Sequence, residues 1–184
     1  TWDSSLFIAG EFETIQGKTI PSIARRKGNG WSALGTGLEG SYSYASWLAP
    51  TPEALWVSGD FSIAGGKPAD GLAYWDGSSW TPVETGDGSG GAPLANIGDV
   101  VYVGPRYHVM RWDGSQWHRL GGPFSNWGAV KAVDGELFVV GRFTTIGDLP
   151  SPYFARWQDC ETTVAACPST TTTMPPGPGC GDAT

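Results

Sequence analysis

The chain has 184 residues with a net charge of −7, only 16% charged residues, 28 glycines and ten tryptophans. No long stretch shows a sustained 3.6-residue apolar period, which excludes a helical bundle and favours many short strands joined by tight turns. The one basic cluster, Arg25-Arg26-Lys27, is too small for the basic stripe of a nucleic-acid binder, and no apolar run approaches the roughly 18 residues that cross a membrane.

A short apolar segment that contains a glycine recurs four times along the chain. The segments are L-F-I-A-G-E-F (6–12), L-W-V-S-G-D-F (55–61), V-V-Y-V-G-P-R (100–106) and L-F-V-V-G-R-F (137–143), aligned on Gly10, Gly59, Gly104 and Gly141. Apolar, β-branched and aromatic runs bounded by glycine predict buried strands. Recurrence at intervals of 37 to 49 residues indicates a repeat architecture.

A second element follows each apolar segment and predicts a β-hairpin. Asp76-Gly77 and Asp113-Gly114 are dipeptides that adopt positive φ at low cost, and Gly28-Asn29-Gly30 replaces them in the first copy. Tryptophans flank two of these turns, Trp75 with Trp80 and Trp112 with Trp117. Glycine- and proline-rich loops join the two elements, except in the third copy, which lacks the loop.

One more strand precedes the apolar segment, most clearly at 130–133, where the turn Asp134-Gly135 follows. Each copy then holds about four strands, and four-stranded sheets at this period predict the blades of a β-propeller. An open blade leaves both of its faces uncovered, so the four tryptophans are expected to be structural and to fill the space between blades. A sugar-stacking platform is the alternative role for these indoles.

The combined pattern, L-[FW]-V-x-G-x-F, a glycine-rich loop and then A-R-W-D-G-S-x-W-x-x-L-G, resembles the Trp-Asp-Gly repeats of secreted bacterial propellers and is related in style to kelch and galactose-oxidase blades. The resemblance covers residues 2–160, with copies near 2–40, 41–90, 91–125 and 126–160. It implies an all-β propeller of four-stranded blades. The D-G-x-x-W turn differs in spacing from the Asp-box of sialidases, so no sialidase residues are carried over.

The two ends of the repeat region predict an incomplete ring of about three to four blades. The first copy is expected to begin within its opening strand, and the last copy has its third strand (154–157) but no W-x-x-L-G strand after it. Because propellers commonly close by pairing an N-terminal strand with the last blade, we expect the missing strand and further blades to lie upstream of Thr1.

The C-terminal part of the chain has the composition of a secreted protein. Cys160 and Cys167 are expected to close the end of the domain (161–168) with a disulfide worth about 2–3 kcal/mol, and Cys180 to pair beyond Thr184. The Thr/Pro-rich stretch 169–179 predicts a disordered linker, and 180–184 the start of a truncated further module. The linker resembles those before dockerin-type modules, so calcium is expected only beyond Thr184.

Residues able to carry chemistry are few. Neither His108 nor His118 lies near a plausible nucleophile in the sequence, and no metal, cofactor or catalytic motif occurs. The position after the repeat's glycine is polar in three copies, Glu11, Asp60 and Arg142, and these are the candidate ligand-facing residues.

Two functions remain open from the sequence. The first is a secreted, noncatalytic propeller at the cell surface or outside the cell that binds a protein or a carbohydrate and needs no cofactor. The second is a fragment of a propeller enzyme, such as a glycoside hydrolase, lyase or oxidase, whose catalytic residues lie outside this chain. A fold alone does not choose between them.

Overall fold

The computed structural model describes residues 2–40, 43–86, 90–104, 108–121, 128–146 and 149–158. In these ranges the chain consists of β-strands, turns and irregular connections without any helix, so the expected all-β class is confirmed. No helix that would cross a membrane is found among these residues. Cys160, Cys167 and Cys180, the linker and the region after it lie outside the described residues.

Four antiparallel sheets follow one another in chain order and are named sheets I to IV here. Sheet I contains β1 (Leu6–Ala9), β4 (Ile23–Lys27) and β5 (Gly30–Ser32). Sheet II contains β7 (Tyr44–Pro50), β8 (Leu55–Asp60), β11 (Leu72–Trp75) and β12 (Trp80–Pro82). Sheet III contains β13 (Leu94–Ile97), β14 (Val100–Val103), β15 (Val109–Trp112) and β16 (Trp117–Gly121), and sheet IV contains β17 (Gly128–Val133), β18 (Glu136–Gly141) and β21 (Phe154–Gln158).

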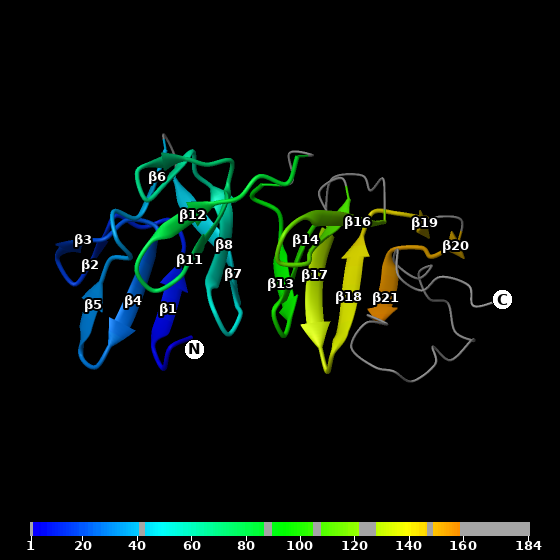
Figure 1. Ribbon diagram of the computed structural model, residues 1–184, viewed down its shortest axis with the longest axis horizontal. Coiled ribbons are helices and arrows are strands. Elements are labelled where there is room, and N and C mark those ends of the chain that lie inside the picture. The colour runs from blue at the N-terminus through cyan, green and yellow to red at the C-terminus, as the bar shows by residue number, and fades with distance from the viewer. Residues whose placement is uncertain are drawn as a thin grey trace.

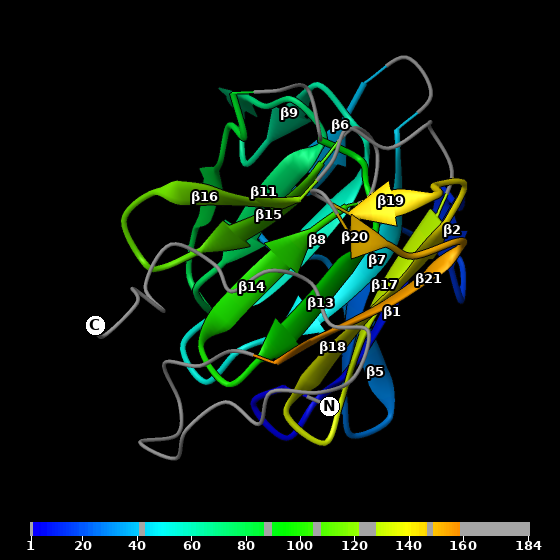
Figure 2. The same ribbon diagram turned by 90° about the vertical axis from the view of Figure 1, so that its right-hand side faces the viewer.

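Each sheet pairs its strands in chain order, and each sheet packs against the next one. Figure 1 shows the four sheets succeeding one another along the molecule, from blue at sheet I to orange at β21. The first strand of sheet II, β7, contacts both β1 and β13, and β13 in turn contacts β17. In Figure 2, the view turned by 90°, strands of successive sheets overlie one another. None of the described sheets closes on itself.

Shorter strands form small sheets beside the main ones. They are β2 (Thr14–Ile15) with β3 (Lys18–Thr19), β9 (Ile63–Ala64) with β10 (Lys67–Pro68) and β6 (Leu38–Glu39), and β19 (Thr145–Ile146) with β20 (Leu149–Pro150). Three of these pairings occupy the segments that the sequence predicts to be glycine- and proline-rich loops. Two-residue strands are too short to display the alternation by which a strand is recognised in a sequence.

The strand register shows that the four copies share one structural position. Leu6 lies opposite Arg26, Leu55 opposite Trp75, Val101 opposite Trp112 and Leu137 opposite Trp157. The sequence alignment, which is made on the glycines, places Val100 at this position in the third copy. The third copy is therefore one residue shorter between this position and its glycine. An alignment on Gly104 consequently displaces the strand of the third copy by one residue from its true register.

The hydrophobic core is divided into three clusters, one between each pair of neighbouring sheets. Side chains alternate along a strand, and β8 shows this directly, because Leu55 and Val57 face sheet I whereas Trp56 faces sheet III. Sheets II and III are thus buried on both faces. This explains why their central strands have continuous apolar runs where a half-exposed sheet would have alternating polar residues.

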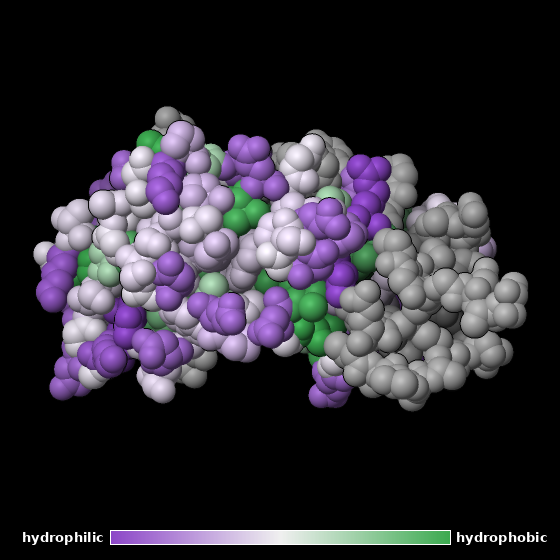
Figure 3. Space-filling view, viewed as in Figure 1, coloured by the Kyte–Doolittle hydropathy of each residue, from purple (hydrophilic) through white to green (hydrophobic). Residues whose placement is uncertain are grey.

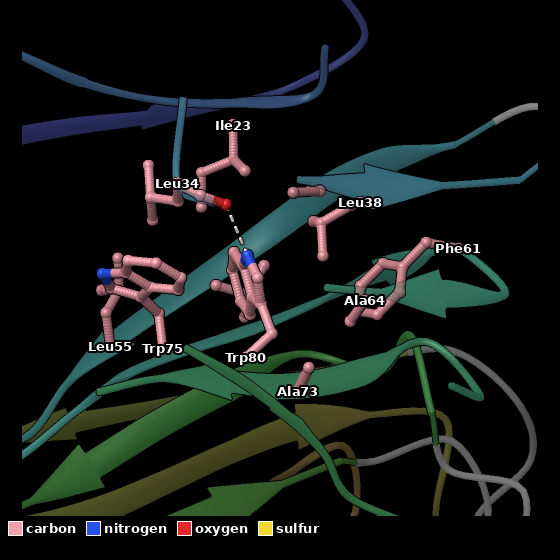
Figure 4. Packing of buried hydrophobic residues seen from close by; sticks show 11 residues of the cluster. Ile23, Leu34, Leu38, Leu55, Phe61, Ala64, Ala73, Trp75 and Trp80 are labelled. Carbon is pink, nitrogen blue, oxygen red and sulfur yellow. Dashed lines mark hydrogen bonds between the residues drawn. The ribbon is translucent and has the colours of Figure 1, made fainter. Parts of the chain in front are cut away.

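The predicted structural tryptophans lie between sheets. Trp75 and Trp80 are buried in the cluster between sheets I and II, with ring centroids 5.4 Å apart. The indole Nε1 of Trp80 donates a hydrogen bond of 2.7 Å to the Leu34 carbonyl oxygen, which ties sheet II to the segment after sheet I (Figure 4). Trp112 and Trp117 pack at the edge of the cluster between sheets II and III.

Trp117 occupies the same position in β16 as Trp80 does in β12, because each is paired with the preceding tryptophan across the hairpin turn. The two indoles differ in one respect. The Nε1 atom of Trp117 is buried but has no hydrogen-bond partner within the described ranges. The two residues thus share a position, but Trp80 is buried and carries a hydrogen bond, whereas Trp117 is partly buried and carries none with a described residue.

We predict that Trp80→Phe destabilises the chain more than Trp117→Phe. Both changes remove the same part of an indole, but only Trp80→Phe removes a hydrogen bond, at a cost of about 0.5–1.5 kcal/mol, while the Leu34 carbonyl keeps the Gly37 amide as its other donor. The free energy of unfolding, measured with urea by tryptophan fluorescence, is the readout. Equal losses for the two variants would contradict a stabilising role for the Trp80 hydrogen bond.

Candidate functional site

An open cleft lies where the beginning of the chain meets two turns of sheet II. Its volume is about 730 Å³, and its lining combines one indole, two prolines and three carboxylates. The lining residues are Trp2, Asp3, Pro50, Thr51, Pro52, Glu53, Asp76 and Gly77.

One wall of the cleft is a tight turn at residues 2–5. The sequence predicts part of an opening strand here, but Asp3 and Ser4 have φ of 49° and 54°, and the Ser5 amide donates to the Trp2 carbonyl at 2.9 Å. Arg25 of β4 holds the turn in place, because its Nη2 donates to the Asp3 carboxylate at 2.7 Å and its Nε to Ser5 Oγ at 3.0 Å. The difference from the expected strand is confined to residues 2–5, where hydrogen bonds from the Arg25 side chain hold a turn in place of an extended strand.

The second wall is the turn between β7 and β8. Thr51 is buried, and its hydroxyl accepts the Ala54 amide hydrogen bond at 3.1 Å while the Thr51 amide donates to the Ala54 carbonyl at 2.8 Å. This closed turn leaves Pro52 and Glu53 exposed at its tip. From sheet III, Asn96 Nδ2 donates to the Pro50 carbonyl at 2.8 Å, so the turn is fixed from both sides.

The third wall is the turn between β11 and β12. Asp76 Oδ1 accepts hydrogen bonds from the Ser78 and Ser79 amides, each at 2.7 Å, and both serine hydroxyls also donate to this carboxylate. These donors, the backbone amides first, hold the pKa of Asp76 well below its usual range. Asp76 is thus an ionised acceptor at neutral pH, at the edge of the cleft.

The third copy repeats this turn. Asp113 Oδ1 accepts from the Ser115 and Gln116 amides at 2.8 and 2.9 Å, and His118 Nε2 lies 2.6 Å from Asp113 Oδ2. The His118 contact is the largest of the causes that lower the pKa of Asp113. His118 thereby has a structural partner within its own hairpin.

These Asp-Gly turns differ from the expected two-residue type. Only the glycines adopt positive φ, 101° at Gly77 and 98° at Gly114, because the aspartates serve as acceptors for the turn's amides. The dipeptide Asp134-Gly135 does form a two-residue turn between paired strands, with φ of 51° and 80°. The serine after the glycine therefore distinguishes the two kinds of turn in this chain.

The three carboxylates of the cleft are not equivalent. Asp3 is paired with Arg25, and Asp76 is satisfied by its own turn, whereas Glu53 makes no hydrogen bond or ion pair with any described residue. Glu53 is thus the carboxylate with its full hydrogen-bonding capacity open to a ligand. No cluster of three or more His, Cys, Asp or Glu side chains suited to a metal ion occurs within the described part of the chain.

The residues predicted to face a ligand lie elsewhere. All three residues, Glu11, Asp60 and Arg142, are exposed. They lie at or just after the ends of β1, β8 and β18, the strands formed by the recurring apolar segment, and so at the opposite end of the sheets from the cleft. Glu11 and Asp60 belong to neighbouring sheets. Sheet III stands between Asp60 in sheet II and Arg142 in sheet IV, so Arg142 is separated from the other two.

Two exposed aromatic residues accompany Asp60. Tyr44 lies opposite Asp60 across β7 and β8, and Trp47 follows a β-bulge in β7, with exposed fractions of 36% and 39%. The bulge brings β7 so close to β8 that a Cβ at Gly59 would collide with the Tyr44 carbonyl oxygen and the Ala45 Cα. This close approach is the physical reason for the repeat's glycine in the second copy.

The sequence offers little that would have located the cleft. Trp2, Glu53 and Asp76 are far apart in the chain, none is part of a recognised motif, and Asp76 reads as a turn residue. Only the packing of sheet I against sheet II brings the three walls together. No family model matches this chain, and no curated protein matches its sequence.

We predict that Asp76→Asn makes unfolding less sensitive to acid. The pKa of Asp76 is lowered in the folded state, so its stabilising contribution is complete above the unfolded pKa of about 4 and is lost as the pH falls below it. The readout is the urea midpoint between about pH 6 and pH 2. The control is Asp99→Asn, since the Asp99 side chain makes no hydrogen bond with described residues. A variant curve parallel to the wild-type curve would contradict the prediction.

Proposed function

We propose that the chain is a secreted, noncatalytic binding module with a propeller-like arrangement of blades, and that the cleft binds a carbohydrate bearing hydroxyl or amino groups. The observation that carries the proposal is the cleft itself, in which an indole and two proline rings adjoin carboxylate acceptors. A protein ligand is the alternative occupant of the same cleft.

Three features support the propeller part of the proposal. Successive sheets pack face to face in chain order, their first strands contact one another, and equivalent residues share one register. These are the relations expected between neighbouring blades. A location outside the cell is supported by the Thr/Pro-rich tract and the three cysteines of the sequence.

The chemistry of the cleft suits a sugar. A sugar ring has apolar C–H faces that pack on flat apolar side chains such as Trp2, and hydroxyls that donate hydrogen bonds to ionised acceptors such as Glu53. The volume of about 730 Å³ lies within the range of small-molecule sites. Three carboxylates disfavour sulfated or carboxylated sugars, because like charges repel.

A glycoside hydrolase is the second candidate, and the gathering of three carboxylates in one cleft favours it. Hydrolysis requires one protonated carboxyl as the general acid beside an ionised partner. Asp76 is held ionised and Asp3 is paired with Arg25, which leaves Glu53 as the carboxyl for that role. A fixed network of ionised acceptors suits binding better than proton transfer, so binding is our first choice.

We predict that the chain binds neutral or amino sugars on a glycan array and that Trp2→Ala and Glu53→Gln each weaken the binding at least tenfold, because they remove the apolar platform and the free acceptor. Tyr44→Ala, an exposed aromatic residue at the opposite end of the sheet, is the matched control and should leave the affinity unchanged. Binding by calorimetry with the best array hit gives the affinities.

Absence of any glycan above background would contradict carbohydrate binding. Equal binding by wild type and Trp2→Ala would place the ligand outside the cleft. A strong preference for anionic glycans would contradict the electrostatic argument.

For the second candidate we predict no turnover of a panel of chromogenic glycosides. The measurement is release of the chromophore over a range of pH, with Glu53→Gln as the control. Turnover by the wild type that Glu53→Gln abolishes would replace the noncatalytic proposal with a hydrolase.

A further inference from the structure

The two terminal sheets each leave one face uncovered by any described residue of this chain. The outer face of sheet IV contains Phe138, Val140 and Phe154, and the outer face of sheet I contains Leu6 and Trp31. In the space-filling view the surface is mainly hydrophilic, with a hydrophobic patch near the region where β13 and β17 meet in Figure 1 (Figure 3). Three apolar residues of the two outer faces are well exposed, Leu6 at 46%, Val140 at 42% and Phe154 at 53%.

The residue that starts the third strand of each copy is buried in the other sheets but exposed in sheet IV. Phe154 starts the third strand of its copy, as Ile23, Leu72 and Val109 do in theirs. Those three are 1%, 0% and 0% exposed, since each packs under the following sheet, whereas Phe154 is 53% exposed. Sheet IV thus presents a face made to be covered by a following sheet.

The outer face of sheet I shows the opposite half of the same interface. Leu6 is 46% exposed, whereas its equivalents Leu55, Val101 and Leu137 are 2%, 0% and 0% exposed, because each packs on the preceding sheet. Sheet I thus presents a face made to rest on a preceding sheet. One chain therefore displays both complementary halves of the contact that it repeats three times internally.

We infer that sheet IV of one copy packs on sheet I of a second copy, and that two copies close head to tail into a ring of eight sheets. The contact continues the internal sheet-to-sheet interface, which is the evidence that selects a second copy as the occupant. Eight lies within the roughly four to eight blades typical of propellers. In this ring, sheet IV of each copy contacts sheet I of the other, and a twofold axis relates the two contacts. No end face is left free, so the head-to-tail contact does not extend into an open filament. The inference rests on the propeller-like arrangement proposed above.

Both end faces carry basic residues. On sheet I, Arg26 lies opposite Leu6 and Trp31, at the position that Trp75, Trp112 and Trp157 occupy in the other copies, and on sheet IV, Lys131 lies opposite Phe138. Arg156 lies on the outer face of sheet IV opposite Phe138, and its equivalents Arg25 and Arg111 lie opposite Phe7 and Tyr102, on faces that a following sheet already covers. Arg156 also has an acidic neighbour, with its Nη1 3.6 Å from Glu136 Oε1. An arginine at this position thus occurs in two of the three internal interfaces, and Tyr74 takes its place in sheet II.

The test is the mass of the full chain in solution, by light scattering on a sizing column and by sedimentation over a concentration series. We expect twice the chain mass of 19.4 kDa. Phe154→Glu and Leu6→Glu should each raise the dimer Kd at least tenfold, because every closed dimer uses both faces. Trp47→Glu is the matched control, since Trp47 is an exposed aromatic residue on neither end face, and it should leave the mass unchanged.

The pattern of outcomes separates the alternatives. A wild type that is monomeric at all concentrations overturns the inference, as does a dimer that Phe154→Glu disrupts and Leu6→Glu does not, which would be an isologous contact between two sheet IV faces. Near-ultraviolet circular dichroism of each variant establishes that the fold is retained. Glycan binding is measured separately through Trp2 and Glu53, so a monomer that still binds sugars overturns the ring and leaves the proposed function standing.

Discussion

The packing of one small sheet on the next is the interaction on which the rest of this structure depends. A sheet of three or four short strands has two faces and no core of its own, so burial requires a neighbour on each side. Sheets II and III obtain both neighbours within the chain, and their strands carry apolar side chains in both directions. The indole of Trp80, bonded to the Leu34 carbonyl, spans one such interface.

The same packing creates the cleft. The turn before β8 and the turn before β12 project from one end of sheet II, and Arg25 of sheet I holds the turn at Asp3 beside them. Each wall is a turn that hydrogen bonds already hold in place. Arg25 binds the Asp3 carboxylate, the Thr51 hydroxyl accepts from the Ala54 amide, and the Asp76 carboxylate accepts from the amides of its own turn. The site is therefore preorganised, which suits recognition of a ligand, since little ordering of the protein remains to be done on binding.

The sequence predicts more of the local structure than of the site. Apolar runs bounded by glycine, and Asp-Gly turns between tryptophans, locate the main strands because strand periodicity and turn chemistry act over a few residues. The two-residue strands beside the main sheets carry no such signal. Glu11, Asp60 and Arg142 share a position in the repeat, yet their shared position places them at separate sheets, whereas Trp2 and Glu53, which share no pattern, line one cleft.

By itself, the sequence determined the all-β class and the residues able to serve as core, because composition and alternation record which side chains need burial. Only the tertiary structure decided the register of the third copy, where Val101 takes the place that the glycine alignment assigns to Val100. It also decided which faces are covered, so that Leu72 is buried and Phe154 exposed at one and the same position. Burial depends on what packs above a residue, and that neighbour is distant in the chain.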